Sequence, residues 1–165
     1  FLETHKFVDS SFKFNFLLSS FEVHNPSKLV IEKGVMFRDF CNVMLYKNAT
    51  LIIKEGVFMN RYCSVNCLGK IAIGSNTIFG EGVKIYDHNH DYRGIDNGLS
   101  IKQTGLKIGK VLIGSNCWIG SNVTILNNVE IGDNVVIGAN VSVYKSIKSG
   151  SVIVNNQNHK NLQIK

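Results

Sequence analysis

The sequence predicts an all-β protein whose chain winds into a β-helix of stacked triangular coils. Three observations lead to this prediction. Val, Ile and Asn are abundant while strong helix formers are few, which argues against a helical fold. Proline is nearly absent, with Pro26 alone, and alanine is scarce. Most informative, the residue pattern repeats every six positions over a long stretch of the chain.

The six-residue period is clearest over residues 113–143. The first position of every unit is Ile or Val, and the fifth is Val or Cys. The fourth position is always Asn, namely Asn116, Asn122, Asn128, Asn134 and Asn140. A hexapeptide repeat is typical of a β-helix. We expect the first and fifth positions to point inward. The fourth should lie at a corner where the backbone adopts a positive φ, which Asn and Gly tolerate best.

The same phase recurs upstream with less regularity. Ile31, Ile53 and Ile73 begin comparable units, and the spacings between them are 22 and 20 residues. Three units would close one coil of about 18 residues, and coils would stack at the strand spacing of about 4.8 Å. Short corner insertions explain the longer spacings. We therefore predict about five coils, which form one domain over residues 31–147.

Three segments depart from the period. Residues 1–30 are rich in Phe, and we expect them to cap the first coil. Residues 148–165 should cap the last coil, because an open solenoid end leaves strand edges unpaired. The third segment, about residues 87–110, is polar, contains four glycines and must leave the coil as a loop. Loops on a rigid scaffold commonly carry function.

Composition narrows the range of partners. Lys and Arg number 18 and Asp and Glu 12, so the net charge is +6 and favours an anionic partner. The basic residues are scattered without an aromatic-interleaved stripe, which argues against nucleic acid. No run approaches the roughly 18 apolar residues of a membrane span. Four cysteines without paired metal spacing favour a reducing, cytoplasmic location, although a secreted protein could also use four.

The cysteines are predicted to be structural. Cys41, Cys63 and Cys117 fall on the fifth, inward position of their units, where a small buried thiol fits. Cys63 and Cys67 are four residues apart without a second pair, which argues against a zinc site.

Two histidines open the long loop and are the main candidates for chemistry. His88 and His90 lie between Asp87 and Asp91. Imidazole titrates near neutral pH, so one of them could act as a general base, typically worth roughly 10² to 10⁴ in rate. A metal site formed by the pair is the rival interpretation, but the neighbouring coils lack a third histidine.

Three further side chains are expected on outward positions in the same region. Trp118, the only tryptophan, occupies the sixth position of its unit and favours a ligand or interface surface. Asn60 is outward as well. Glu81 is either a solvated corner carboxylate or a group that orients a loop histidine.

Three motifs together carry a resemblance to a known family. They are the Asp-His-Asn-His loop start, the Ile-Gly-Ser-Asn-Cys-Trp-Ile-Gly-Ser return and the Ile-Gly-Ala-Asn-Val-Ser-Val-Tyr-Lys run. Over about residues 50–150 the chain resembles the hexapeptide-repeat acyltransferases with a left-handed β-helix. The similar branch contains sugar O-acetyltransferases that act on galactosides, maltose and polysaccharides.

The resemblance implies roles for individual residues. The catalytic histidine falls on His90, with His88 as the alternative, and Glu81 is counted with them. Substrate-binding positions fall on Asn60, Trp118 and Asp87, with the tryptophan facing the pantetheine and the acceptor from a neighbouring subunit. Contacts to coenzyme A fall on Gly80, Ser121, Ala139, Tyr144, Lys145 and Lys160. Tyr144 replaces the usual Thr, and residues 155–160 replace the usual Gly-Asn-Pro-Ala-Lys.

The resemblance also implies a reaction and an assembly. The enzyme would be a homotrimer with active sites at subunit interfaces, and it would need no metal. It would move an acetyl group directly from acetyl-CoA to a saccharide hydroxyl, such as one on a capsular or surface polysaccharide unit. Alternatives are an N-acetyltransferase of an amino-sugar nucleotide, a serine or antibiotic acetyltransferase, a carbonic-anhydrase-like zinc enzyme and a non-catalytic assembly β-helix.

Overall fold

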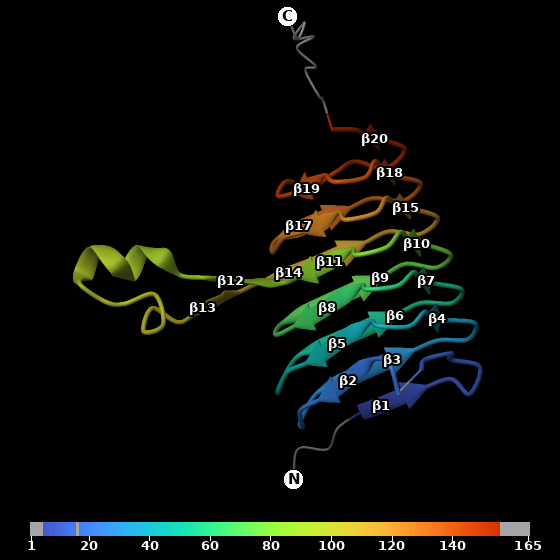
Figure 1. Cartoon of the computed structure of the whole chain (residues 1–165), viewed down its shortest axis with the longest axis horizontal. Coiled ribbons are helices and arrows are strands. Elements are labelled where there is room, and N and C mark those ends of the chain that lie inside the picture. Colours follow the sequence, from blue (N-terminus) through green and yellow to red (C-terminus); the bar gives the residue numbers. More distant parts are fainter. Residues whose placement is uncertain (1–4, 16, 156–165) are drawn as a thin grey trace, which may run out of the picture.

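The computed structural model describes residues 5–15 and 17–155, and these form a triangular prism of parallel strands (Figure 1). Sheet A contains β1 (His5–Val8), β3 (Lys28–Ile31), β6 (Thr50–Ile53), β9 (Lys70–Ile73), β14 (Lys110–Ile113) and β17 (Val129–Ile131). Sheet B contains β4 (Met36–Phe37), β7 (Phe58–Met59), β10 (Ile78–Phe79), β15 (Trp118–Ile119), β18 (Val136–Ile137) and β20 (Val152–Ile153). Sheet C contains β2 (Ser20–Val23), β5 (Asn42–Leu45), β8 (Ser64–Cys67), β11 (Lys84–Tyr86), β16 (Thr124–Ile125) and β19 (Ser142–Val143).

The predicted all-β, left-handed parallel β-helix is confirmed, with about six turns where we expected about five. The additional turn comes from the amino-terminal segment. Strand β1 pairs in parallel with β3, Lys13 bridges to Met36, and β2 pairs with β5. The segment expected to cap the first coil thus extends the sheets. In place of a hexad pattern, this segment has Phe side chains that pack on one another, on Phe37 and against the core.

The corners adopt the backbone conformation that the repeat predicts. The five Asn residues at the fourth position of residues 113–143 all have positive φ, between 56° and 61°. Gly34, Gly56 and Gly82 have φ of 68–69° at corners of the earlier coils. Two corners differ, because Phe40 and Tyr62 adopt φ of 63° and 62° although their side chains are bulky.

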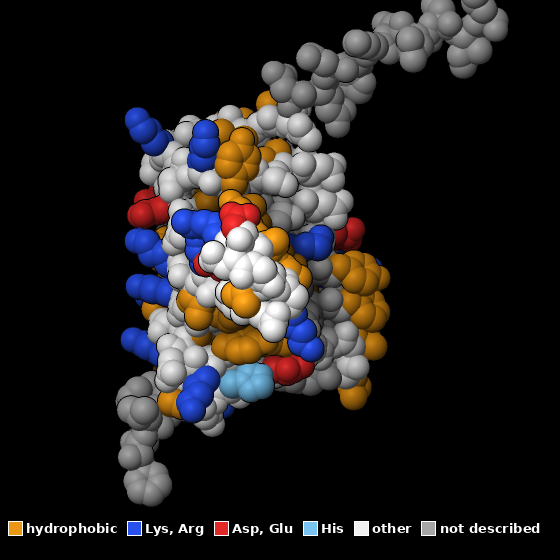
Figure 2. All heavy atoms as spheres, turned by 90° about the vertical axis from the view of Figure 1, so that its left-hand side faces the viewer, with side chains coloured by type: hydrophobic (Ala, Val, Ile, Leu, Met, Phe, Trp, Pro, Cys, Tyr) orange, Lys and Arg blue, Asp and Glu red, His pale blue; other side chains and the backbone are white. Residues whose placement is uncertain are grey.

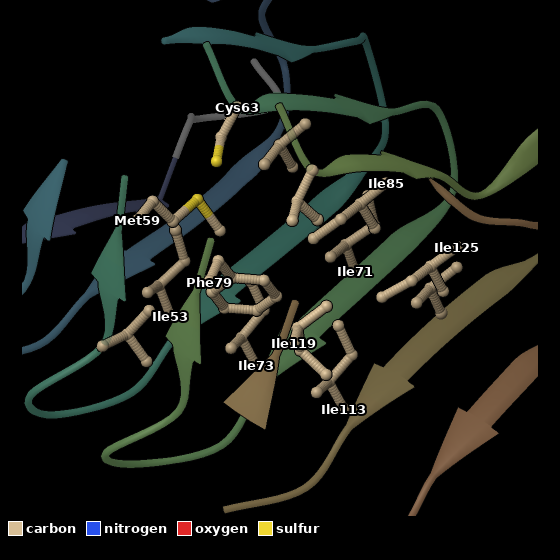
Figure 3. Packing of buried hydrophobic residues seen from close by; sticks show 14 of the residues in the cluster. Ile53, Met59, Cys63, Ile71, Ile73, Phe79, Ile85, Ile113, Ile119 and Ile125 are labelled. Atoms are coloured by element: carbon tan, nitrogen blue, oxygen red, sulfur yellow. The ribbon is translucent and has the colours of Figure 1, made fainter. Parts of the chain in front are cut away.

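Inward side chains form apolar stacks that fill the prism. Ile73, Phe79 and Ile85 come from the three walls of one coil, and the same arrangement repeats with Ile113, Ile119 and Ile125 in the next (Figure 3). Cys41, Cys63 and Cys117 are each 2% exposed, which confirms the predicted inward position of these thiols. All four cysteines are free and buried.

A hairpin interrupts the prism between β11 and β14. Strand β12 (His88–His90) pairs antiparallel with β13 (Leu106–Ile108), and the 3₁₀ helix η1 (Tyr92–Asn97) lies near the tip. The hairpin projects away from the prism at the corner between sheets C and A (Figure 1). The predicted loop over about residues 87–110 is therefore an ordered arm. No helix in the described part of the chain is long and apolar enough to cross a membrane.

Candidate active site

The hairpin is fastened to the prism through Asp87. Its side chain is fully buried and continues the inward stack of Leu45 and Cys67. The carboxylate accepts hydrogen bonds from the amide of Leu68 (2.9 Å to Oδ1) and from that of Gly69 (2.8 Å to Oδ2). Gly109 N–H donates to the carbonyl oxygen of Asp87 at 2.7 Å and closes the base of the hairpin. Two strands of the arm therefore leave and rejoin the prism at one fixed point.

The glycine at position 69 is required by this close packing. A Cβ atom there would lie 2.5 Å from the carbonyl oxygen of Gly109 and 2.6 Å from a methyl carbon of Ile108. Beneath the carboxylate, burial and then the negative charge of Asp87 raise the pKa of the Cys67 thiol. That thiol is therefore not a nucleophile at neutral pH.

The two histidines lie on the strand that leaves this anchor. His88 is 20% exposed, and its Nδ1 lies 3.3 Å from Oδ1 of Asp87. Its ring also meets Tyr86 edge-on, with 6.0 Å between the ring centroids. The Asp87 carboxylate thus limits the orientation of the His88 imidazole and leaves its Nε2 atom directed elsewhere.

His90 lies one pleat further along the same strand and is exposed. It pairs with Leu106 of β13 in the hairpin register. The carboxylate of the next residue, Asp91, lies 3.3 Å from the Lys107 ammonium and 3.8 Å from the Arg93 guanidinium. Asp91 therefore forms ion pairs with these two cations rather than with His90. Because β12 alternates sides, His88 and His90 project from the same face of the hairpin.

A second group of predicted residues lies at the opposite end of sheet C, at its corner with sheet B. Backbone hydrogen bonds connect this corner in consecutive coils. The donors are the N–H groups of Gly82, Asn122 and Asn140, and the acceptors are the carbonyl oxygens of Arg61, Glu81 and Ser121, respectively. The stacked corner contains Asn60, Gly80, Glu81, Ser121 and Ala139. The coils approach so closely here that a Cβ on Gly80 would lie 2.6 Å from the Ser121 nitrogen.

Trp118 is on the outer face of sheet B and is 55% exposed, as its position in the hexad predicts. It belongs to an outward ladder in which every member is apolar. In register order the ladder is Met36, Phe58, Ile78, Trp118, Val136 and Val152. An unbroken apolar row on an outer face of a β-helix is unusual for a surface that stays in water.

Tyr144 and Lys145 lie in the last coil, at the corner between sheets C and A. The Lys145 Nζ is 5.7 Å from the centroid of the Tyr144 ring. Both residues line a shallow pocket of about 240 Å³ at the carboxyl end of the prism. Lys160, the remaining predicted coenzyme A contact, lies outside the described residues.

The predicted residues thus fall into separate groups within the chain. His88, His90 and Asp87 are at the hairpin base, while Asn60, Glu81 and Trp118 are at or beside the corner of sheets B and C. Among the described residues, no hydrogen bond or ion pair joins Glu81 to either histidine. The predicted substrate contact by Asp87 is also inconsistent with its full burial, because its carboxylate oxygens are held by backbone amides. Asp87 positions the hairpin instead.

Sequence reasoning overlooked two features of these sites. The amides of Leu68 and Gly69 that hold Asp87 carry no side-chain signal. Phe40 and Tyr62, in contrast, occupy the fourth position of their units, where Asn or Gly is the rule. That departure from the repeat could have been noticed in the sequence.

Comparison with known proteins identifies the repeat. Residues 110–145 match the family described as bacterial transferase hexapeptide (six repeats). The resemblance to hexapeptide-repeat acyltransferases is thereby confirmed.

One curated relative is similar to about half of this chain. It is named "Putative acetyltransferase YvoF", from Bacillus subtilis (strain 168), and is 39% identical over 90 residues. The match covers 53% of this chain and 44% of the relative. The chain therefore spans less than half the length of that protein.

Two solved structures are similar to this chain in fold. The maltose O-acetyltransferase from Clostridium difficile 630 has a TM-score of 0.57 and 28% identity, over 84% of this chain and 66% of that one. AntD, an N-acyltransferase from Bacillus cereus solved in complex with dTDP and 3-hydroxybutyryl-CoA, has a TM-score of 0.66. It is 22% identical over 84% of this chain and 72% of that one, so the likeness to AntD concerns the fold.

Proposed function

We propose that this protein is a cytoplasmic acetyltransferase that moves an acetyl group from acetyl-CoA to a hydroxyl of a saccharide, for example a unit of a surface polysaccharide. The observation that carries the proposal is the paired-histidine hairpin, fixed by a buried carboxylate at mid-height of a hexapeptide-repeat prism. A β-helix with a purely structural role has no need of such an arm. The names of YvoF and of the maltose O-acetyltransferase support the same reaction class.

In the proposed reaction His90 is the general base, with His88 as the alternative. The imidazole takes the proton of the acceptor hydroxyl while the oxygen forms a bond to the thioester carbonyl carbon. The C–S bond then breaks, and the imidazolium returns the proton to the departing sulfur. Every atom is accounted for without a covalent enzyme intermediate. General-base help of this kind is typically worth roughly 10² to 10⁴ in rate.

The remaining residues would bind and align the two substrates. We propose Asn60, Glu81 and Trp118 on the acceptor side and Gly80, Ser121 and Ala139 along the coenzyme A groove. Holding two reactants in line supplies a large share of the acceleration of such reactions.

Features at the carboxyl end fit an anionic, nucleotide-containing substrate. Tyr144 offers an exposed ring, and Lys145 a cation that no carboxylate of the described residues neutralises. Near the hairpin, Lys28, Lys70 and Lys110 occupy equivalent, exposed positions on sheet A. Figure 2 looks onto the hairpin and the corner between sheets C and A, and it shows Lys and Arg side chains in a column along the left edge of the molecule. These charges also suit an acidic saccharide.

We further propose a homotrimer in which the hairpin of one protomer covers sheet B of the next. The arm exposes large apolar side chains that its own chain leaves uncovered, namely Tyr92, Ile95, Leu99, Ile101, Leu106 and Ile108. The apolar ladder of sheet B is a matching surface. Such docking would bring His90 of one protomer beside Trp118 of its neighbour and complete the site.

The test is a thiol-release assay with acetyl-CoA against a panel of mono- and oligosaccharides. Free thiol should appear only when a suitable sugar is present. His90→Ala should lower the rate about 10²- to 10⁴-fold, and His88→Ala separates the two candidates. Full activity in the double variant would reject the histidine base.

The second candidate is N-acyl transfer to an amino-sugar nucleotide, which the likeness to AntD keeps open. Amino sugars in the same panel decide between the two. Transfer to the amine with no reaction at any hydroxyl would favour the N-acyltransferase.

A further inference from the structure

Two aromatic rings are stacked in the open at the corner between sheets B and C. Phe40 and Tyr62 lie with ring centroids 5.1 Å apart and planes 7° from parallel. Their exposed fractions are 44% and 58%, so about half of the pair faces solvent rather than the core. An exposed parallel pair of this kind is a ready surface for a flat ligand face.

Phe40 and Tyr62 both adopt a backbone conformation that is unfavourable for bulky residues. Their φ angles of 63° and 62° lie in the left-handed region, and all other described non-glycine residues with positive φ are Asn. A bulky residue there costs free energy that Asn would largely avoid. Strain of this kind persists mainly at functional positions. The Nε atom of Arg61, next to Tyr62, is also buried without a hydrogen-bond partner among the described residues.

The stack ends at Tyr62 and leaves one ring face accessible. The corner order is set by backbone bonds, in which Tyr62 N–H donates to Asp39 and Gly82 N–H donates to Arg61. Phe40 covers one face of Tyr62, and the next corner position, Gly82, has no side chain to cover the other. The accessible face is thus directed toward the coil that holds Glu81.

Polar side chains lie beside the stacked pair. Asn60 and Arg61 precede Tyr62, and the Arg38 Nη1 lies 3.4 Å from the Asn60 Oδ1. The Arg61 guanidinium is 3.9 Å from the Asp39 carboxylate, and Glu81 is exposed one coil further on. An exposed aromatic face with amide, guanidinium and carboxylate groups nearby suits a sugar ring, whose C–H face is apolar and whose edge carries hydroxyls.

We propose that Tyr62, backed by Phe40, is the stacking surface for a sugar ring of the saccharide acceptor. The proposal rests on the proposed function and deepens it, because it assigns an oligosaccharide rather than a monosaccharide as the preferred acceptor. Asn60 beside the ring contacts the reacting sugar, and Tyr62 holds the adjoining one. The surface therefore sets acceptor length rather than the chemical step.

The test uses a substitution that the fold should accept. Tyr62→Asn removes the ring and installs the residue found at most other corners, whereas Tyr62→Phe keeps the ring. Tyr46→Asn is the matched control, since Tyr46 is also an exposed ring (41%) in a stack, with His24, at another corner. Purified full-length proteins are compared on an array of defined neutral and acidic mono-, di- and trisaccharides.

Wild type, Tyr62→Phe and Tyr46→Asn should be retained by the same di- or trisaccharides. Tyr62→Asn should lose roughly fivefold to tenfold in affinity for them, while its affinity for acetyl-CoA and its oligomeric state stay unchanged. Its thermal unfolding midpoint should equal or exceed that of wild type. Retention equal to wild type overturns the proposal, and so does the absence of any bound saccharide. A changed oligomeric state overturns it as well, because the rings would then belong to a subunit contact.

The array is independent of acyl transfer. Retention that depends on Tyr62 without thiol release from acetyl-CoA would support the stacking surface and reject the acetyltransferase. Thiol release that is as efficient in Tyr62→Asn as in wild type at low oligosaccharide concentration would support the acetyltransferase and reject the stacking surface.

Discussion

Single residues determine the geometry of the corners. Asn134 has a φ of 56°, and its side chain is exposed, so its contribution is mainly conformational. We expect Asn134→Ala to lower the free energy of unfolding by about 1 kcal/mol, because a left-handed conformation disfavours most L-residues. Asn134→Gly should cost less, since glycine adopts this φ freely. Chemical denaturation measures both, and equal losses in the two variants would contradict the explanation.

The anchor of the hairpin is also a single residue. Asp87→Asn keeps the shape but leaves one acceptor oxygen for the amides of Leu68 and Gly69, which now use both. The second N–H would face an amide NH₂ group, so we expect a loss of about 1–3 kcal/mol in unfolding free energy. Asp91→Asn, at a half-buried surface ion pair, should lose less than about 1 kcal/mol. Equal losses would mean that the buried carboxylate is not an anchor.

The buried Cys67 thiol predicts a pH dependence of stability. Its pKa is raised in the folded state, so above the ordinary thiol pKa of about 8.5 the unfolded chain loses this proton while the folded chain keeps it. Stability should therefore fall as the pH rises, with a slope of up to about 1.4 kcal/mol per unit from this group. Cys67→Ala should show a shallower fall between pH 8.5 and 9.5 in denaturation curves. An unchanged slope would contradict the assignment.

The hairpin is the element that separates function from fold. We expect that joining Tyr86 to Val111 through two Asn residues, as the next coil joins Leu126 to Val129, leaves a cooperatively folded prism. Thiol release from acetyl-CoA should be abolished, because both histidines are removed. Circular dichroism and the thiol assay measure the two properties, and retained transfer would place the catalytic group elsewhere.

The strands and corners could be predicted from the sequence where the six-residue repeat is regular. From Ile113 onward the period located strands, corners and inward positions, since each depends only on local sequence. The first turn was not recognised, because β1 and β2 are defined by pairing with β3 and β5 rather than by their own pattern. The paired histidines were visible as a motif, but the burial of Asp87 depends on amides 18 and 19 residues away and could not be read locally.

The assembled molecule is where the two halves of the candidate site would meet. The apolar ladder of sheet B should hold the proposed trimer together. Ile78→Lys introduces a charge beside Trp118 on this ladder without touching the core, since Ile78 is 45% exposed. We expect the variant to remain folded and to sediment as a monomer, with thiol release reduced at least tenfold. A variant that keeps the wild-type mass in sedimentation would remove sheet B from the interface.

The position of the hairpin also affects how the chain can fold. Partners on β14 and β17, such as Ile113 and Ile131, are 18 residues apart, whereas Ile73 and Ile113 on β9 and β14 are 40 apart. Doubling the length of a closing loop costs about 0.6 kcal/mol in chain entropy. If folding proceeds coil by coil, the pairing of β14 with β9 is therefore the slowest step. The bond from Gly109 to the carbonyl of Asp87 offsets the difference. Once β12 and β13 are paired, the two ends of the hairpin lie together. The effective loop between β9 and β14 is then about as short as the loops between other consecutive coils.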